Sequence, residues 1–138
     1  METNQACNFL VDSQADISVI KISCIKTYIK FNENEKINIT GITTSSISTL
    51  GTIHITITIG NYEIPQKFHI VSNNFNIPSD GILGKDFLKT NKCKINYDDM
   101  TLSVRLKNFN IKVPILHGTS IDNCIIPPRC EVFRIFKL

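Results

Sequence analysis

The residues with the clearest capacity for chemistry lie near the amino end of the chain. Asp12 and Ser13 follow a short apolar run, Phe9 to Val11, and the apolar pattern resumes at Ile17. A polar segment between two apolar ones predicts a loop that carries a carboxylate between buried strands. Such a carboxylate is a candidate general base for activating water. Because Asp and Ser are also common turn residues, this segment taken alone fits a structural turn equally well.

The elements that must position this loop are expected to be strands. Thr52 to Ile59 alternates isoleucine with threonine or histidine, which predicts a strand with one buried face. Lys67 to Val71 predicts another strand, which Pro65 should separate from the residues before it. Asn96 to Leu106 predicts a hairpin, and Lys85 to Thr90 is the one segment expected to form a short helix. The pattern therefore predicts a mostly β domain.

Size and composition narrow the function classes. The chain has 138 residues, enough for a single domain with a hydrophobic core. Its formal net charge of +3 comes from 15 basic and 12 acidic residues spread along the sequence, so no nucleic-acid-binding stripe is predicted. We see neither a signal-peptide pattern nor an apolar run of membrane-spanning length, and therefore expect a soluble cytoplasmic protein without membrane partners.

The sequence does not predict a metal or a cofactor. The cysteines are odd in number and irregularly spaced, which favours reduced thiols over a disulfide framework: Cys7, Cys24, Cys93, Cys124 and Cys130. The histidines lack metal-ligand spacing: His54, His69 and His117. The glycines form neither a phosphate loop nor a dinucleotide fingerprint.

Two segments, in the right order, resemble the landmarks of retroviral and retrotransposon aspartic proteases. Phe9 to Ile20, FLVDSQADISVI, is similar to the catalytic segment of that family, in which apolar residues precede Asp-Ser/Thr-Gly-Ala. Asp80 to Leu88, DGILGKDFL, resembles the second landmark, in which two apolar residues and a glycine open a short helix. Gly41 to Gly51 occupies the place of the family's flap hairpin. The resemblance extends over Asn8 to Leu106.

This resemblance implies an all-β fold: a closed, retropepsin-like acid protease barrel with a flap hairpin and one short helix, active as a homodimer. Hydrolysing a peptide through water needs one carboxylate as base and one carboxylic acid as proton donor. A single catalytic loop offers only Asp12, so each of two subunits is expected to supply one. The implied activity is that of an aspartic endopeptidase that processes the Gag-Pol polyprotein of a gypsy-like LTR retrotransposon, in the cytoplasm or inside virus-like particles.

The resemblance also implies roles for individual residues. Asp12 and Ser13 are the expected catalytic residues, with the Ser13 hydroxyl bonding across the dimer axis. The substrate backbone is expected to lie against residues of the catalytic loop and the flap: Ala15, Asp16, Gly41, Ile42 and Thr43. The residues expected to support the loop are Gln14, Ile82, Leu83, Gly84 and Lys85. Among them, Lys85 is expected to pair with Asp16 in place of the family's commoner arginine.

One position in the catalytic segment leaves a second function open. Gln14 stands where the family usually has glycine, in a loop that approaches its symmetry mate. The alternative is therefore a catalytically degenerate retropepsin-fold domain that serves dimerisation or peptide binding.

The expected domain boundary lies near Lys107. Residues 1–107 are assigned to the protease domain, and residues 108–138, which contain three prolines, to a connector towards reverse transcriptase. The segment Ile126 to Val132, IPPRCEV, resembles the connector of gypsy-type polyproteins. Only eleven residues precede Asp12, so an expected alternative is that part of this tail, Ile111 to Leu116, replaces a missing amino-terminal strand.

Overall fold

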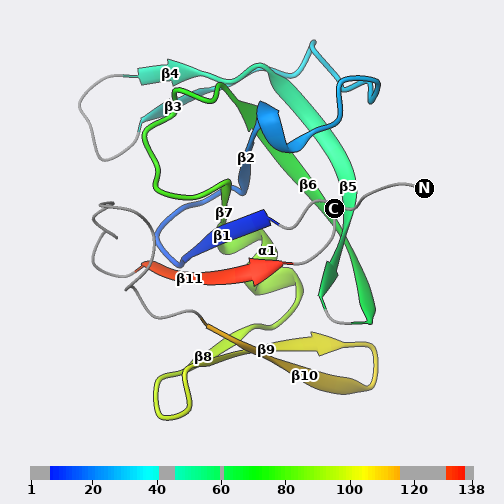
Figure 1. Cartoon of the computed structure of the whole chain (residues 1–138), viewed down its shortest axis with the longest axis vertical. Coiled ribbons are helices and arrows are strands. Elements are labelled where there is room, and N and C mark those ends of the chain that lie inside the picture. Colours follow the sequence, from blue (N-terminus) through cyan, green and yellow to red (C-terminus); the bar gives the residue numbers. More distant parts are fainter. Residues whose placement is uncertain (1–6, 41–45, 60, 116–129, 136–138) are drawn as a thin grey trace.

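The computed structural model describes residues 7–40, 46–59 and 61–115, and the backbone of residues 130–135. Within these ranges the chain is mostly β, with one 3-10 helix, η1 (Ile22–Cys24), and one α-helix, α1 (Lys85–Thr90). Figure 1 shows a large central sheet with smaller sheets at its two ends. Gly41, Ile42 and Thr43, the expected substrate contacts of the flap, lie outside the described residues.

The central sheet has six strands, in the order β11, β1, β7, β2, β6, β5. They are β1 (Cys7–Asp12), β2 (Val19–Lys21), β5 (Gly51–Ile59), β6 (Tyr62–Val71), β7 (Gly81–Leu83) and β11 (Cys130–Ile135). Strand β1 pairs parallel with β7, and β2 pairs parallel with β6. The loop between β1 and β2 therefore leaves the sheet on one side of β7 and returns on the other.

The expectation of a closed barrel is corrected by this strand order. The ladder of the described residues ends at β11 and at β5, and these two strands are not hydrogen-bonded to each other. They do come within 8 Å at their Cα atoms, because the sheet curls strongly. The result is a curled open sheet in which the long hairpin of β5 and β6 forms one edge.

The smaller sheets flank this one. One contains β8 (Lys94–Asn96), β9 (Thr101–Leu106) and β10 (Phe109–Pro114), and it lies beyond α1 in Figure 1. The other contains β3 (Asn38–Thr40) and β4 (Ser46–Ser48), which pair antiparallel where the flap hairpin was expected.

The hydrophobic core forms where the alternation along the strands predicts it. On β5, Ile53, Ile57 and Ile59 are buried, while His54 and Thr56 are exposed. Three phenylalanines, Phe9, Phe68 and Phe87, are fully buried, and the rings of Phe9 and Phe68 lie 5.5 Å apart between centroids. Such tilted aromatic contacts add to the free energy of apolar burial. The core therefore joins β1, β6 and α1.

The chain beyond residue 107 takes part in the sheets. The expected boundary falls in the turn between β9 and β10, and Val113 and Ile115 are buried in the core. Strand β11 pairs antiparallel with all six residues of β1, from Cys7 opposite Ile135 to Asp12 opposite Cys130. The strand that pairs with β1 therefore lies later in the chain than the expected segment Ile111 to Leu116. The role of residues 108–138 as a connector remains a prediction.

Candidate active site

The loop predicted to be catalytic begins where β1 ends, at Asp12. The Gln14 backbone N–H donates a hydrogen bond of 2.8 Å to Asp12 Oδ1, and the Ala15 N–H lies 3.3 Å from the Asp12 carbonyl oxygen. This tight turn fixes one carboxylate oxygen. Asp12 is half-buried, whereas the side chains of Ser13 and Gln14 are exposed. The loop therefore presents a carboxylate held by the backbone beside an exposed hydroxyl.

Gln14 occupies this turn with an ordinary backbone. Among the described residues, the non-glycine residues with positive φ are Lys92 and Met100, so Gln14 is outside the left-handed region that favours glycine. Within one chain, the loop thus holds a glutamine without backbone strain, and the side chain turns outward.

The floor of the loop is formed by the chain that follows β7. The Lys85 N–H donates a hydrogen bond of 2.7 Å to the Ala15 carbonyl oxygen. A Cβ on Gly84 would lie 2.5 Å from the Ile17 carbonyl oxygen and 2.7 Å from that of Ala15. Both distances are shorter than real Cβ contacts, so this position requires glycine. The second sequence landmark thus lies directly against the first.

A pair of residues that the sequence analysis missed ties the loop to the floor. Ser18 is fully buried, and its hydroxyl donates a hydrogen bond of 2.6 Å to Asp86 Oδ1 while accepting one of 3.0 Å from the Gly84 N–H. The Ser18 N–H also donates to Asp86 Oδ2, at 3.1 Å. Ser18 interrupts an otherwise apolar run and Asp86 lies in the first turn of α1, which were the available signals.

The Asp86 carboxylate is fully engaged in this role. Besides Ser18, it accepts hydrogen bonds from the Phe87 N–H at 2.8 Å and from Gln66 Nε2 at 3.0 Å. Its two oxygens therefore have four donors, which come from the loop, β6 and α1. A carboxylate satisfied in this way serves to position other groups.

The comparisons with known proteins agree with this geometry. Residues 3–96 match the sequence profile of the family described as "Retroviral aspartyl protease". The chain belongs to the retroviral aspartyl protease family. Over 130 residues it is 39% identical to "Retrovirus-related Pol polyprotein from transposon 412" of Drosophila melanogaster. That alignment covers 91% of this chain and 10% of the polyprotein, so the chain spans about one tenth of this relative. The resemblance seen in the sequence is thereby confirmed.

A solved structure supports the fold of this aspartyl protease domain. The retroviral protease-like domain of Ddi1 from Leishmania major has a TM-score of 0.59, with 19% sequence identity. The match covers 90% of this chain and 100% of that one. The mostly β, retropepsin-like fold is therefore confirmed.

The remaining predicted site residues of the aspartyl protease domain differ in how firmly they are held. Leu83 is fully buried in the core and Ile82 is half-buried, where it lies opposite Leu10 on β1 and Val19 on β2. Lys85 Nζ lies 3.4 Å from Asp16 Oδ1, with side chains 41% and 87% exposed. An ion pair this exposed contributes little to stability.

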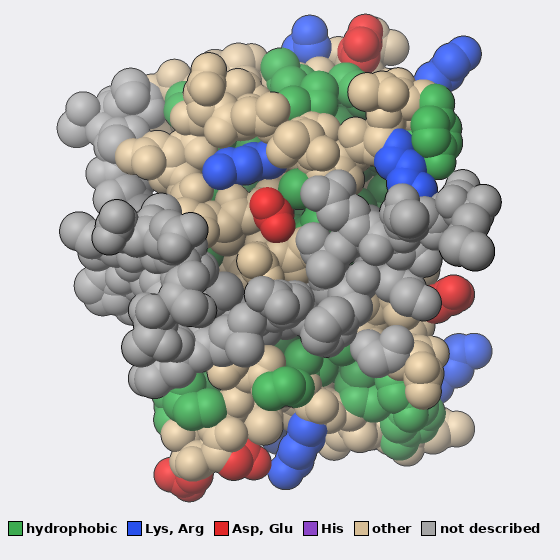
Figure 2. All heavy atoms as spheres, viewed as in Figure 1, with side chains coloured by type: hydrophobic (Ala, Val, Ile, Leu, Met, Phe, Trp, Pro, Cys, Tyr) green, Lys and Arg blue, Asp and Glu red, His purple; other side chains and the backbone are tan. Residues whose placement is uncertain are grey.

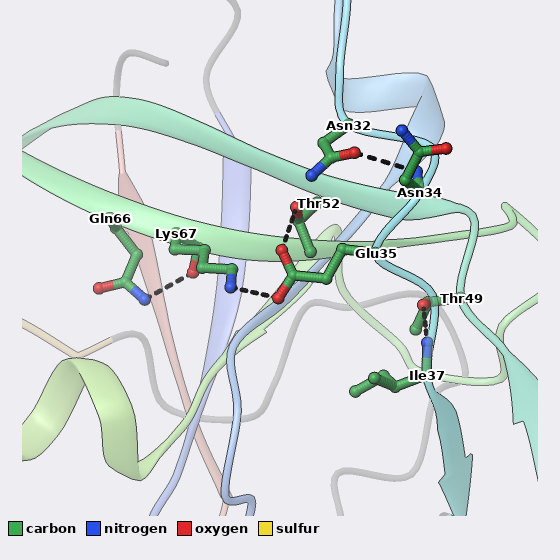
Figure 3. A network of polar contacts seen from close by, with 8 residues as sticks. All are labelled: Asn32, Asn34, Glu35, Ile37, Thr49, Thr52, Gln66 and Lys67. Atoms are coloured by element: carbon green, nitrogen blue, oxygen red, sulfur yellow. Dashed lines mark hydrogen bonds and ion pairs between the residues drawn. The ribbon is translucent and has the colours of Figure 1, made fainter.

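A second polar network holds the base of the β3–β4 hairpin (Figure 3). Glu35 accepts a hydrogen bond of 3.0 Å from Thr52 Oγ1 and forms an ion pair with Lys67. These two contacts join the segment before β3 to β5 and β6. The hydrogen bond from Lys67 lowers the pKa of the Glu35 carboxyl, and that from Thr52 lowers it further. Nearby, the Ile37 N–H donates to Thr49 Oγ1 at 2.9 Å.

The structure also shows a cavity away from the Asp12 loop. A cavity of about 470 Å³ is lined by residues of β5, β6 and α1, including Gln66, Lys67 and Asp86, but not by Asp12 or Ser13. On the face shown in Figure 2, the charged side chains of the described residues lie scattered, without a continuous basic stripe. No helix in the described parts of the chain has the length and apolar character needed to cross a membrane.

Proposed function

We propose that this domain is an aspartic endopeptidase that cleaves extended segments of its own Gag-Pol polyprotein, with one Asp12 supplied by each of two subunits. The observation that carries the proposal is the position of Asp12, at the end of a buried strand, with one oxygen held by the Gln14 N–H and a close-packed floor beneath its loop. Membership of the retroviral aspartyl protease family supports the same chemistry.

The mechanism needs two carboxyl groups, and one chain brings one. Among the described residues near the loop, Asp86 is saturated by four donors and Asp16 points to solvent beside Lys85. Neither is available to share a proton with Asp12. A two-fold axis that brings the Asp12 loops of two copies together supplies the missing acid, so the dimer is the enzyme. One carboxylate then removes a proton from water while its partner protonates the peptide carbonyl.

The substrate class follows from the loop. Ala15 and Asp16, just beyond the catalytic turn, are proposed to contact an extended substrate backbone, together with Gly41, Ile42 and Thr43 of the flap. Extended peptides bind to such sites mainly through main-chain hydrogen bonds. We place this activity in the cytoplasm or within virus-like particles, where the polyprotein is assembled.

The test is proteolysis by the full chain and by an Asp12→Asn variant, using a library of extended peptides at mildly acidic pH. The amide keeps the shape of the side chain but removes the base, so cleavage should fall by a factor of about 100 or more while folding is unchanged. The matched control is Asp98→Asn, an exposed aspartate in the turn after β8. Equal cleavage by Asp12→Asn and the natural chain would contradict the proposal.

The dimer requirement is tested by mixing. Adding an excess of Asp12→Asn subunits to active protein should suppress cleavage, because each mixed dimer lacks one carboxylate, whereas added Asp98→Asn should not. A monomer by sedimentation that retains full specific activity would rule the mechanism out.

The second candidate function, a degenerate dimerisation or peptide-binding domain, is favoured by Gln14 alone. In that case the natural chain binds peptides without cleaving them, and Gln14→Gly restores cleavage by letting the two loops approach. We expect Gln14→Gly to change turnover little, because the loop already accommodates glutamine without strain.

A further inference from the structure

Two buried cysteines lie beside each other at the end of β1 away from Asp12. Cys7 is the first residue of β1 and Cys24 the last of η1, and their side chains are 1% and 8% exposed. Both sulfur atoms and one carboxylate oxygen of Asp80 lie within 4.8 Å of one another. Neither cysteine is in a disulfide in this structure. The proposed protease chemistry uses none of these groups.

The backbone around the pair is fixed by Asp80. The Asn8 N–H donates to Asp80 Oδ2 at 2.8 Å, and the Asp80 N–H donates to the Asn8 carbonyl oxygen at 2.9 Å. The Asp80 carbonyl oxygen in turn accepts the Lys21 N–H at 2.9 Å. The chain segments that carry Cys7 and Cys24 are thus both tied to one residue, so the two sulfur atoms are held as neighbours.

The two thiols are chemically unequal. A hydrogen bond between their side chains raises the pKa of the Cys7 thiol and lowers that of Cys24, while burial and the nearby Asp80 charge act to raise the pKa of both thiols. Cys24 is also the more exposed of the two. The thiolate is the nucleophilic form, so Cys24 is the sulfur that reacts first. By contrast, burial alone raises the pKa of Cys93 to about 12, which makes it unreactive.

We propose that Cys7 and Cys24 form a reversible intrachain disulfide, a redox site separate from the proteolytic one. With hydrogen peroxide as oxidant, the Cys24 thiolate attacks one peroxide oxygen, the O–O bond breaks, and Cys24 becomes a sulfenic acid. The departing hydroxide takes up the proton that the Cys24 thiol released on ionising and leaves as water. The Cys7 sulfur then attacks the Cys24 sulfur, the S–O bond breaks, and the Cys7 proton leaves with the hydroxide as water. The two thiols lose two electrons in total, and the peroxide is reduced to two waters.

This bond would close a ring around the catalytic loop, since residues 12 to 18 lie between the two cysteines. A cross-link of this span lowers the entropy of the unfolded chain. Because it joins the start of β1 to the segment after β2, it should resist the separation of the two strands that frame Asp12. Oxidation is therefore expected to stabilise the folded catalytic loop.

The experiment is mild oxidation of the folded full chain with peroxide, followed by alkylation, trypsin and mass spectrometry. Trypsin separates the two cysteines, because cleavage after Lys21 and Lys26 gives the peptides Met1 to Lys21 and Ile22 to Lys26, each with a single cysteine. We expect one cross-linked species equal to the sum of these peptides less two hydrogens. The melting temperature should rise by about 10 °C and return on reduction with dithiothreitol.

Matched variants distinguish the Cys7–Cys24 disulfide from oxidation at other residues. Cys7→Ala and Cys24→Ala should each lose both the cross-linked peptide and the rise in melting temperature, whereas Cys93→Ala should keep both. The proposal is overturned if the oxidised folded protein yields no peptide pair joining Cys7 to Cys24. It is equally overturned if alkylation releases stoichiometric zinc, since the two thiols and Asp80 would then be a metal site.

Discussion

Strand β1, which carries Asp12, has neighbours of two different kinds. On one side, β7 pairs with Phe9, Leu10 and Val11, and the chain around it fits so closely that Gly81 and Gly84 leave no space for a Cβ. On the other side, β11 pairs with all six residues of β1 and comes from the far end of the chain. Figure 1 shows β1 lying between them.

The difference indicates how each side stabilises the strand that carries Asp12. The β7 side depends on close contacts between backbone and small residues, so it should be sensitive to the addition of single atoms. The β11 side supplies a ladder of main-chain hydrogen bonds, which most side chains support equally well. It should therefore be sensitive to deletion and tolerant of substitution.

The largest loss of stability is expected from deleting residues 116–138, which removes β11. The backbone groups of β1 that face β11 would lose their partners along a strand whose apolar side chains are almost fully buried. We expect loss of cooperative thermal unfolding, measured by circular dichroism. Deleting residues 136–138 alone is the control and should have little effect. A truncated protein with an unchanged melting curve would show that the stability of β1 does not depend on β11.

Gly84→Ala tests the β7 side and should cause the second-largest loss of stability. The new Cβ would lie 2.5 Å from the Ile17 carbonyl oxygen, so the floor and the loop must move apart. Overpacking of this kind costs about 3 kcal/mol, measured by urea denaturation. Thr90→Ala, an exposed change in the same helix region, is the control. A cost below about 1 kcal/mol would mean that the floor yields more easily than close packing implies.

Ser18→Ala should cause the third-largest loss of stability, because it removes a hydroxyl that bridges the loop and the floor. The Gly84 N–H loses its acceptor and Asp86 loses its shortest hydrogen bond, at an expected cost of about 2 kcal/mol. A double-mutant cycle with Asp86→Ala measures the coupling, which should be clearly favourable. Additive effects of the two substitutions would show that the two residues act independently.

Glu35→Gln should cause the smallest loss of stability, because the contacts of Glu35 support neither side of β1 and are half-exposed. The pKa of Glu35 is lowered in the folded state, so its contribution is complete above the ordinary value of 4.5 and disappears as the pH falls through the lowered folded pKa. The variant should have a lower melting temperature than the natural chain at neutral pH. This difference in melting temperature should shrink on acidification and in high salt. Glu33→Gln, in the same segment, should show no such difference at any pH.

The sequence predicted those features that depend on local pattern. The isoleucine alternation of β5 and the short helix α1 are confirmed, as is the chain's family. Pro65 was expected to break a strand, but β6 continues through it. Among the described residues, β2 pairs only with residues 69–71 of β6, so no strand pairs with that edge at Pro65 and its missing N–H costs no ladder hydrogen bond there. Ser18 and Asp86 are 68 residues apart, and nothing in either segment indicates the other. Likewise, the partner of β1 could not be found by pattern, because β11 is separated from β1 by almost the entire chain.

The position of β11 has a consequence for timing during synthesis. A ribosome makes the chain from its amino end, so Asp12 and its loop emerge long before residues 130–135 exist. Until then β1 lacks one of its two neighbours, and the pairing with the greatest sequence separation in the sheet is the last to become possible. A protease domain assembled in this order stays immature while its own segment is being translated. Its central sheet is completed only after residues 130–135 have left the ribosome.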